Sequence, residues 1–213
     1  GMKEIIQELK NFLKPKDIGT DSDRALLLDF QATLEIKPEK AIKLEKDALA
    51  QIENITADNA RLVSNLHANL GGLYRMNGHP DLAREHMEKS ISLLDQFNLL
   101  HINDSIPQIA NYAMFLTEQQ EPERGISELQ KLSGIIKEYH SDDCLDYAKV
   151  QETLGTIYLM TANLPQAKTH FKRAFKIYEK IWADEPEMIE AKYQEIQELY
   201  PQIGFCIGKN LSG

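Results

Sequence analysis

Apolar residues recur along this chain every three or four positions, which is the spacing of one face of an α-helix. Proline, glycine and short polar runs separate the periodic stretches. No stretch shows the strict alternation of a strand. The pattern therefore predicts an all-α chain, with helices at about residues 2–14, 22–36, 38–54, 58–77, 80–97, 105–119, 122–139, 142–162, 164–182 and 184–200.

A second pattern repeats over a longer distance. The segments 28–41, 70–83, 112–125 and 154–167 lie 42 residues apart and align position by position. Proline falls at the same place in the first three, at Pro38, Pro80 and Pro122, and one place late at Pro165. An acidic residue follows each of the first three prolines. Proline at the first helical position with an acid beside it marks a helix start, so each unit contains two helices.

The repeated positions explain why the two helices pair. One repeated position of the first helix is apolar in every unit. A repeated position of the second helix holds a small residue, which lets the two backbones approach. A further position of the second helix holds a large apolar side chain in three units and the acidic Glu45 in the first. In chain order these sets are Leu28, Leu70, Tyr112 and Leu154; Ala41, Ala83, Gly125 and Ala167; and Glu45, Met87, Leu129 and Phe171.

These residues resemble the tetratricopeptide repeat, in which a first helix with Leu-Gly and a later Tyr is followed by a Gly and then an Ala. The second unit matches through Leu70, Gly71, Tyr74, Gly78 and Ala83. The fourth unit matches through Leu154, Gly155, Tyr158, Ala162, Ala167, Phe171 and Ala174. In the first and third units Asp29 and Ala113 replace the glycine, and Ala32 and Leu116 replace the tyrosine.

The resemblance implies an all-α, right-handed α-α superhelix, or solenoid, of about four repeats with capping helices at both ends. The period of 42 residues is longer than the usual 34 of this repeat. In this it resembles the long-helix type found in kinesin light chain and in bacterial peptide-sensing repeats. The expected parts are an N-terminal capping helix and linker at 2–19, four repeats within 20–183 (20–55, 56–98, 103–139 and 141–183), and a C-terminal capping helix and tail at 184–213.

The resemblance also implies a concave groove, lined by the first helices, that binds an extended peptide. Asn69 and Asn111 stand just before the Leu-Gly position, where an asparagine amide can both donate to and accept from a peptide group. Leu27 and Thr153 occupy the same place in the other units. The groove residues expected from these phases are Asn65, Asn69, Gly72, Arg75, Met76, Asn111, Met114, Lys149, Glu152 and Thr156. Helix packing for the asparagines and methionines, and solvated charge for Arg75 and Lys149, are the alternatives.

The amino-acid composition limits the kinds of partner that the chain can bind. With 24 basic and 33 acidic residues the net charge is −9, which argues against nucleic acid. No window is long and apolar enough to span a membrane, and we expect a cytoplasmic chain. The amphipathic stretch 2–14 is interpreted as a cap, with a membrane-surface helix as the alternative.

Catalytic chemistry is not expected. The six histidines are scattered, and the two cysteines lack metal-ligand spacing. The densest reactive cluster, at 140–144, lies at a turn where Ser and Asp start helices. We expect no catalytic residue, no metal and no cofactor.

Three functions remain. The first is a non-catalytic scaffold that binds a protein or peptide in the groove. The second is a regulatory or sensory module whose effector is a separate protein, because the chain shows no DNA-binding head. The third is a self-assembling structural protein that forms a homodimer through an array end or through the apolar tail at 203–207, which could also dock on its own chain.

Overall fold

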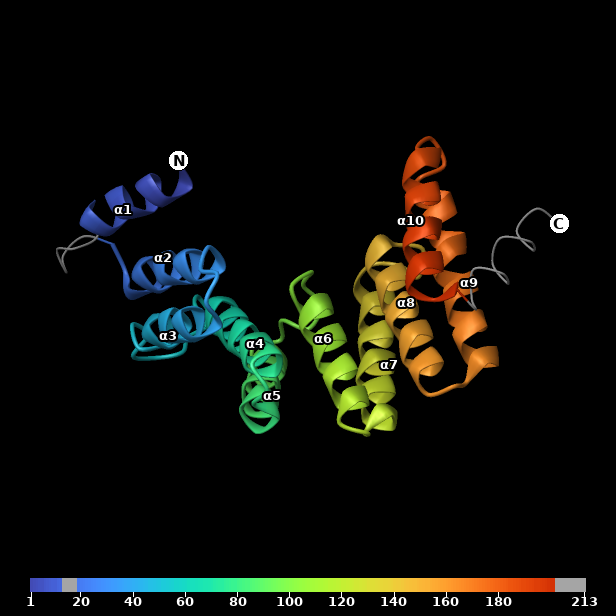
Figure 1. Cartoon of the computed structure of the whole chain (residues 1–213), viewed down its shortest axis with the longest axis horizontal. Helices are drawn as coiled ribbons and strands as arrows, with labels where there is room; N and C mark the ends of the chain where they lie inside the picture. The colour runs from blue at the N-terminus through green and yellow to red at the C-terminus, as the bar shows by residue number, and fades with distance from the viewer. Residues whose placement is uncertain (13–18, 202–213) are drawn as a thin grey trace. The chain divides into compact units, whose positions relative to one another are not determined.

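The computed structural model describes residues 1–12 and 19–201, and the apolar tail singled out above lies outside them. The described residues form helices joined by short connections and include no strand (Figure 1). The all-α helical-repeat fold is confirmed, and the helices begin and end within a few residues of the expected positions. They are α1 (Met2–Phe12), α2 (Asp21–Thr33), α3 (Pro38–Leu49), α4 (Ala60–Met76), α5 (Pro80–Gln96), α6 (Ser105–Glu118), α7 (Pro122–Tyr139), α8 (Leu145–Met160), α9 (Leu164–Ile181) and α10 (Pro186–Leu199).

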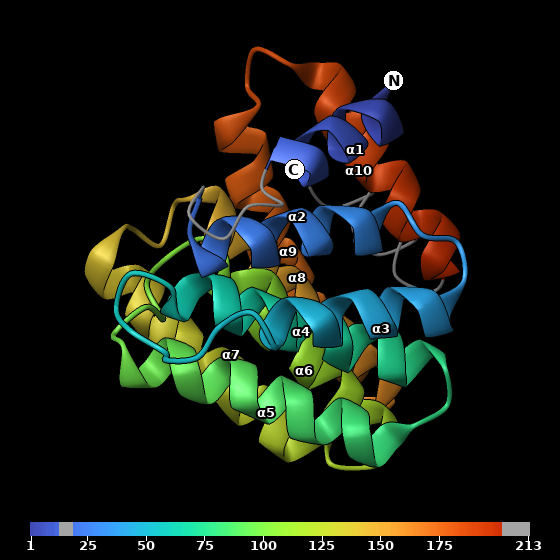
Figure 2. The ribbon, with the colours of Figure 1, turned by 90° about the vertical axis from the view of Figure 1, so that its left-hand side faces the viewer.

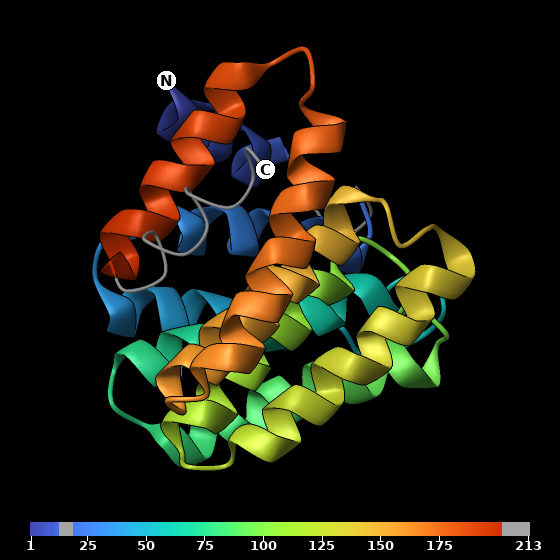
Figure 3. The ribbon, with the colours of Figure 1, turned by 90° about the vertical axis from the view of Figure 1, so that its right-hand side faces the viewer.

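The chain divides into two compact units, Gly1–Gln108 and Ile109–Gly213, with the division inside α6. In the first unit α1 packs on α2, α2 pairs with α3, α3 contacts α4, and α4 pairs with α5 (Figure 2). In the second unit α7 contacts α8, and α8 pairs with α9 (Figure 3). The Tyr193 ring of α10 stacks on Phe175 of α9, with 4.3 Å between ring centroids. No described helix is both long and apolar enough to cross a membrane.

Helix starts follow the predicted chemistry. Pro38, Pro80 and Pro122 are the first residues of α3, α5 and α7, where the missing N–H is not needed. Pro165 comes one place late because Leu164 begins α9, and the Asn163 side chain caps that helix by accepting from the Gln166 N–H. At α8 the helix begins later than expected, at Leu145, with the Cys144 sulfur accepting from the Tyr147 N–H.

Small residues set how closely the paired helices approach. A Cβ atom added to Gly71 would lie 2.6 Å from the Met87 Cγ, and one added to Gly155 would lie 2.8 Å from the Phe171 ring. In the third repeat the order is exchanged: Ala113 takes the glycine position, and Gly125 takes the position that is alanine elsewhere. A Cβ at Gly125 would lie only 2.7 Å from the Ala113 carbonyl oxygen. The third repeat therefore keeps the close crossing by exchanging which helix carries the glycine.

The turn between the two helices contains a left-handed residue in the second, third and fourth repeats. Gly78 has φ of +75°, and the residues 42 and 84 positions on, Gln120 and Ala162, have φ of +65° and +59°. Glycine adopts this conformation at little cost, whereas a side chain is strained there. The glycine of the repeat pattern is thus explained by backbone geometry, and two repeats tolerate a strained substitute.

Helix α10 continues the register beyond the fourth repeat. Ile196 lies 42 residues after Leu154 and is buried, as Leu154 is. Tyr200 lies 42 residues after Tyr158 and contacts the Phe171 ring. In the 42-residue register, α10 therefore occupies the place of the first helix of a fifth repeat.

Candidate functional site

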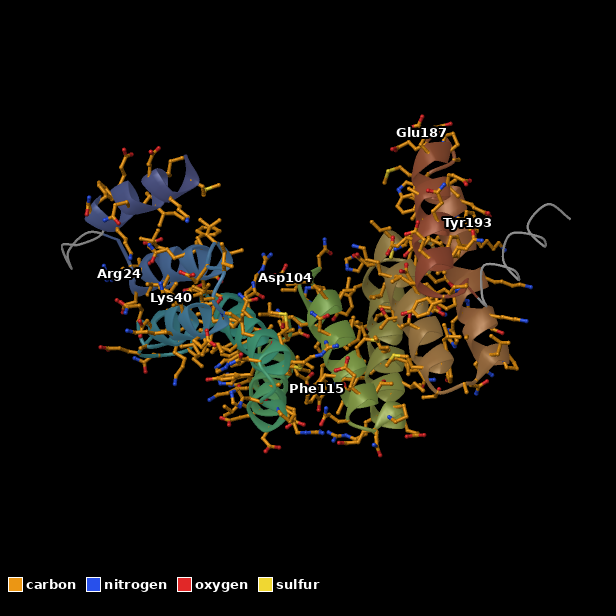
Figure 4. All side chains as sticks on the ribbon, viewed as in Figure 1. Arg24, Lys40, Asp104, Phe115, Glu187 and Tyr193 are labelled. Carbon is orange, nitrogen blue, oxygen red and sulfur yellow. The ribbon has the colours of Figure 1, made fainter. Side chains whose placement is uncertain are left out.

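The candidate site is considered unit by unit, and we call the predicted groove positions the first-helix face of each unit: those on α4 in the first unit, and those on α6 and α8 in the second. These positions fall in both compact units, and each unit is described separately. All side chains of the described residues are drawn in Figure 4.

Asn69, on α4, lies where α2, α3 and α4 meet. Its side-chain amide donates to the Asp29 carboxylate at 2.9 Å and to the Glu45 carboxyl at 3.2 Å. The residue itself remains exposed. Asn69 therefore uses its donor group inside the protein, and only its amide oxygen remains to accept a hydrogen bond from a ligand.

The acids that hold Asn69 are the two residues at which the first repeat departs from the pattern. Asp29 stands at the glycine position, and Glu45, 2% exposed, stands at the bulky apolar position. Burial, followed by the charge of Asp29, raises the pKa of Glu45 to about 8. Burial also raises the pKa of Asp29. A buried carboxyl group this close to a half-buried one favours sharing a proton over two charges.

Asn65 belongs to a polar network within the first unit. Its amide accepts from Gln108 at 2.6 Å and donates to Asp104 at 3.2 Å. Asp104, labelled in Figure 4, accepts two hydrogen bonds from the Arg61 guanidinium, which lower its pKa. Behind Asn65, the Gln108 carbonyl accepts from Ser64 at 2.9 Å. This network holds the start of α6 against α4. Asn65 therefore has a structural role, independent of any role in binding a partner.

The remaining positions on α4 are more open. Gly72 is half-buried and has free space where a Cβ would lie. Met76 is 75% exposed, although methionine is usually a core residue. Arg75 is half-buried and already engaged within the protein. An accessible apolar side chain beside an uncovered backbone is suited to packing against a partner.

In the second unit Asn111 is the most available predicted residue. It is exposed on α6 and makes no hydrogen bond with any described residue. Met114, one turn further along the same helix, is half-buried. Asn111 therefore keeps both the donor and the acceptor capacity that Asn69 has partly used.

The predicted residues of α8 are occupied to different degrees. Lys149 is exposed and lies 3.8 Å from Asp146. Glu152 accepts from the Tyr178 hydroxyl at 2.6 Å and pairs with Lys192 of α10 at 2.9 Å. Burial and the Glu152 charge raise the pKa of Tyr178. The Thr156 hydroxyl donates to the Glu152 carbonyl oxygen at 3.1 Å. Glu152 thus anchors α10, a function that the sequence pattern did not suggest.

Histidines connect the two helices of a repeat in the second and fourth repeats. His67 and His86 lie 2.8 Å apart between their Nδ1 atoms, and His86 stacks on Tyr74. In the fourth repeat His170 stacks on Tyr158 and contacts the Gln151 amide oxygen at 2.9 Å. Burial, with the charges of His86 and Lys89, lowers the pKa of His67 to about 4. These side chains join first helix to second helix within a repeat, and their equivalence is visible in the 42-residue register.

The reactive-looking turn at 140–144 is explained by local structure. Cys144 caps α8, and its thiol contacts the Ser141 carbonyl oxygen at 3.1 Å. Asp143 pairs with Lys180, and Asp142 lies 3.8 Å from Lys137. Across residues 1–12 and 19–201, no group of three or more His, Cys, Asp or Glu side chains could hold a metal ion.

Comparison with known proteins adds the following. The family described as tetratricopeptide repeat matches residues 105–180. No curated protein matches the sequence. Among solved structures, BtubC (BKLC) from P. vanneervenii is 18% identical, with a TM-score of 0.72 over 95% of this chain and 84% of that chain.

Two further structures have similar folds. The first is a candidate kinesin light chain from Podosopora anserina, whose TPR-like repeats are nearly identical to one another. It is 13% identical to this chain, with a TM-score of 0.69 over 85% of this chain and 88% of that chain. MamA is 16% identical, with a TM-score of 0.56 over 82% of this chain and 87% of its own. At these identities the likeness concerns the fold.

Proposed function

We propose, from the premise that this chain is a tetratricopeptide-repeat protein, that it is a non-catalytic scaffold whose first-helix face binds an extended segment of another protein. The tetratricopeptide-repeat fold generally mediates protein–protein interactions. The narrower claim about the first-helix face rests on the chemistry of the side chains found there.

The observation that carries the proposal is Asn111. Its exposed amide, unpaired among the described residues, can donate to and accept from one peptide group of any sequence. Met114 lies one turn away and offers an adaptable apolar contact. A polar clamp beside a pliable apolar surface suits an extended peptide better than it suits a small polar substrate.

A peptide-array screen tests this proposal. Wild type, Asn111→Ala and Gln130→Ala are compared, since Gln130 is an exposed amide on the second helix α7. Loss of two hydrogen bonds, at about 0.5–1.5 kcal/mol each, predicts binding about five- to 150-fold weaker for Asn111→Ala. Gln130→Ala retains wild-type binding. Binding by Asn111→Ala equal to that of wild type would remove Asn111 from the interface.

Self-association is a second candidate function, supported by helix α1. Met2, Ile5, Leu9 and Phe12 share one helix face, and each is exposed by more than two-fifths. Such an uncovered apolar stripe commonly marks a contact surface. Light scattering is expected to detect a dimer that Leu9→Glu dissociates, and a monomeric wild type would exclude this assembly.

A further inference from the structure

The polar contact between the two helices of a repeat differs between the second and fourth repeats. In the second repeat it joins His67 of α4 to His86 of α5, with 2.8 Å between their Nδ1 atoms. In the fourth repeat the same two positions, 84 residues further on, are Gln151 of α8 and His170 of α9. There the His170 Nδ1 atom lies 2.9 Å from the Gln151 side-chain oxygen. The two contacts occupy one register position and differ in the partner on the first helix.

The surroundings of the two contacts are alike. His86 stacks on Tyr74 with 5.4 Å between ring centroids, and His170 stacks on Tyr158 with 5.2 Å. In both repeats the partner on the first helix is buried and the histidine on the second helix is half-buried. A difference in behaviour between the contacts can therefore be assigned to the first-helix partner.

The two contacts respond differently to protons. A hydrogen bond between two imidazole nitrogens needs one N–H and one lone pair, so His67 and His86 can take up one proton and keep the bond, but not two. A second proton also places two like charges side by side. In the fourth repeat the Gln151 nitrogen donates to the Ser133 hydroxyl at 3.3 Å, which turns its oxygen toward His170. His170 therefore donates whether it is neutral or charged, and its bond survives protonation.

The charges around the second-repeat contact do not compensate two added protons. The described side chains whose charges act on the histidine pair are on α3 and α5: Lys46, Glu85 and Lys89. The acids Asp29 of α2 and Glu45 of α3 instead accept from Asn69. The Tyr74 ring of α4, which stacks on the pair, also meets the His79 ring edge-on. One carboxylate against two lysines leaves a doubly protonated pair unfavourable.

We propose that the contact between His67 and His86 is an acid-sensitive latch, which holds α4 to α5 near neutral pH and is released when both histidines are protonated. The latch lies within the second repeat and does not use Asn111, so its failure would leave the proposed scaffold function untouched.

The titration of the two histidines gives the direction of the effect. Burial, followed by the charges of His86 and Lys89, lowers the pKa of His67 to about 4, and burial also lowers the pKa of His86. An opened pair titrates near the ordinary value of 6.5, so opening takes up protons. The pairing of α4 with α5 is therefore most stable above pH 6.5 and weakens as the pH falls toward 4. In the fourth repeat burial lowers the pKa of one histidine only, His170, so the same fall in pH has less effect.

Hydrogen–deuterium exchange of the full chain at pH 7 and pH 5 measures the opening of each helix pair. Rates are corrected for the intrinsic pH dependence of amide exchange. In wild type the corrected rates in α4 and α5 are expected to rise at least about tenfold at pH 5, because the opened pair binds protons that the closed pair excludes. The rates in α8 and α9 are expected to rise less.

Two matched variants exchange the partners. His67→Gln gives the second repeat the partner found in the fourth, and is expected to reduce the acid-induced rise in α4 and α5 to the level of wild-type α8 and α9. Gln151→His makes the opposite exchange, and is expected to raise exchange in α8 and α9 at pH 5 as much as in wild-type α4 and α5. Circular dichroism at pH 7 confirms that the helices are retained. The variants lie in different compact units, so either one tests the latch if the other does not fold.

The inference is overturned if α4 and α5 of the wild type exchange at equal corrected rates at the two pH values. It is also overturned if His67→Gln keeps the full acid-induced rise, or if Gln151→His leaves α8 and α9 as they are in wild type.

Discussion

Glu45 interrupts the apolar pattern of the second helices, and the structure gives this exception a partner. Asp29, the other departure in the first repeat, lies beside it, and Asn69 donates to both. Two substitutions that each weaken the repeat pattern thus complement one another. The sequence places both exceptions in one repeat, but their contact depends on side-chain directions that spacing does not give.

This acid pair predicts a pH dependence. The pKa of Glu45 is raised to about 8, so the folded protein holds a proton that the unfolded chain releases near pH 4.5. The stability from this group is present below pH 4.5, and it is lost as the pH rises toward 8. Glu45→Gln keeps a donor for Asp29 without a titrating group. Urea unfolding is expected to show this variant more stable than wild type at pH 8, by about 1–3 kcal/mol.

The matched control is Asp47→Asn, an exposed acid on the same helix. It is expected to leave the pH profile of unfolding unchanged. A wild-type profile that stays flat from pH 5 to pH 8 would contradict the shared-proton account of Asp29 and Glu45.

Ala162 and Gln120 carry the strain of a left-handed turn residue. Changing Ala162 to glycine relieves about 1–2 kcal/mol of backbone strain in the folded state. It also raises the conformational entropy of the unfolded chain, which disfavours folding by about 0.4–1 kcal/mol. Ala162→Gly is therefore expected to raise the free energy of unfolding by about 0.5–1 kcal/mol. The reverse change, Gly78→Ala, is expected to lower it. Chemical denaturation measures both, and equal effects of the same sign would contradict the turn explanation.

At the scale of helices, the third repeat shows how a pattern can be conserved through an exchange. Gly125 provides the close approach that Gly71 and Gly155 provide elsewhere. The sequence shows the small residues, and it gives the helix bounds closely because proline and capping residues act locally. It does not show which of two facing positions most needs to be glycine, since that depends on the distance between the helices.

Gly125→Ala is expected to destabilise the protein by about 1–3 kcal/mol, because the new Cβ meets the Ala113 carbonyl oxygen. Adding Ala113→Gly recreates the Gly-Ala pairing of the second repeat and lets the helices shift to that spacing. Thermal unfolding of the two single variants and the double variant measures the coupling. Strictly additive effects would show that the two positions do not compensate each other.

Among the candidate site residues, sequence reasoning located Asn111 and Met76 as side chains available to a partner. The sequence left helix packing open for the asparagines, and Asn65 and Asn69 are engaged in this way within the protein. It did not indicate that Glu152 would be engaged as well. Their partners, Gln108, Asp29 and Lys192, come from other helices, and the rotation of one helix against another decides which polar groups meet. A shared repeat phase predicts a common face without predicting which members of it stay free.

At the scale of the molecule, the 42-residue period accounts for most of the architecture. Four helix pairs follow from it, and α10 was also predictable, because Ile196 and Tyr200 are found by adding 42 to Leu154 and Tyr158. The division of contacts into two compact units within α6 has no counterpart in the period.

The central claim is that a partner segment binds the first-helix face and not the second helices. Hydrogen–deuterium exchange of the full chain, with and without the strongest peptide from the array, tests it most directly. The account predicts slower exchange in α6, with Asn111, and no change in α7 or α9. Protection confined to α7 and α9, or no protection at a saturating peptide concentration, would contradict it.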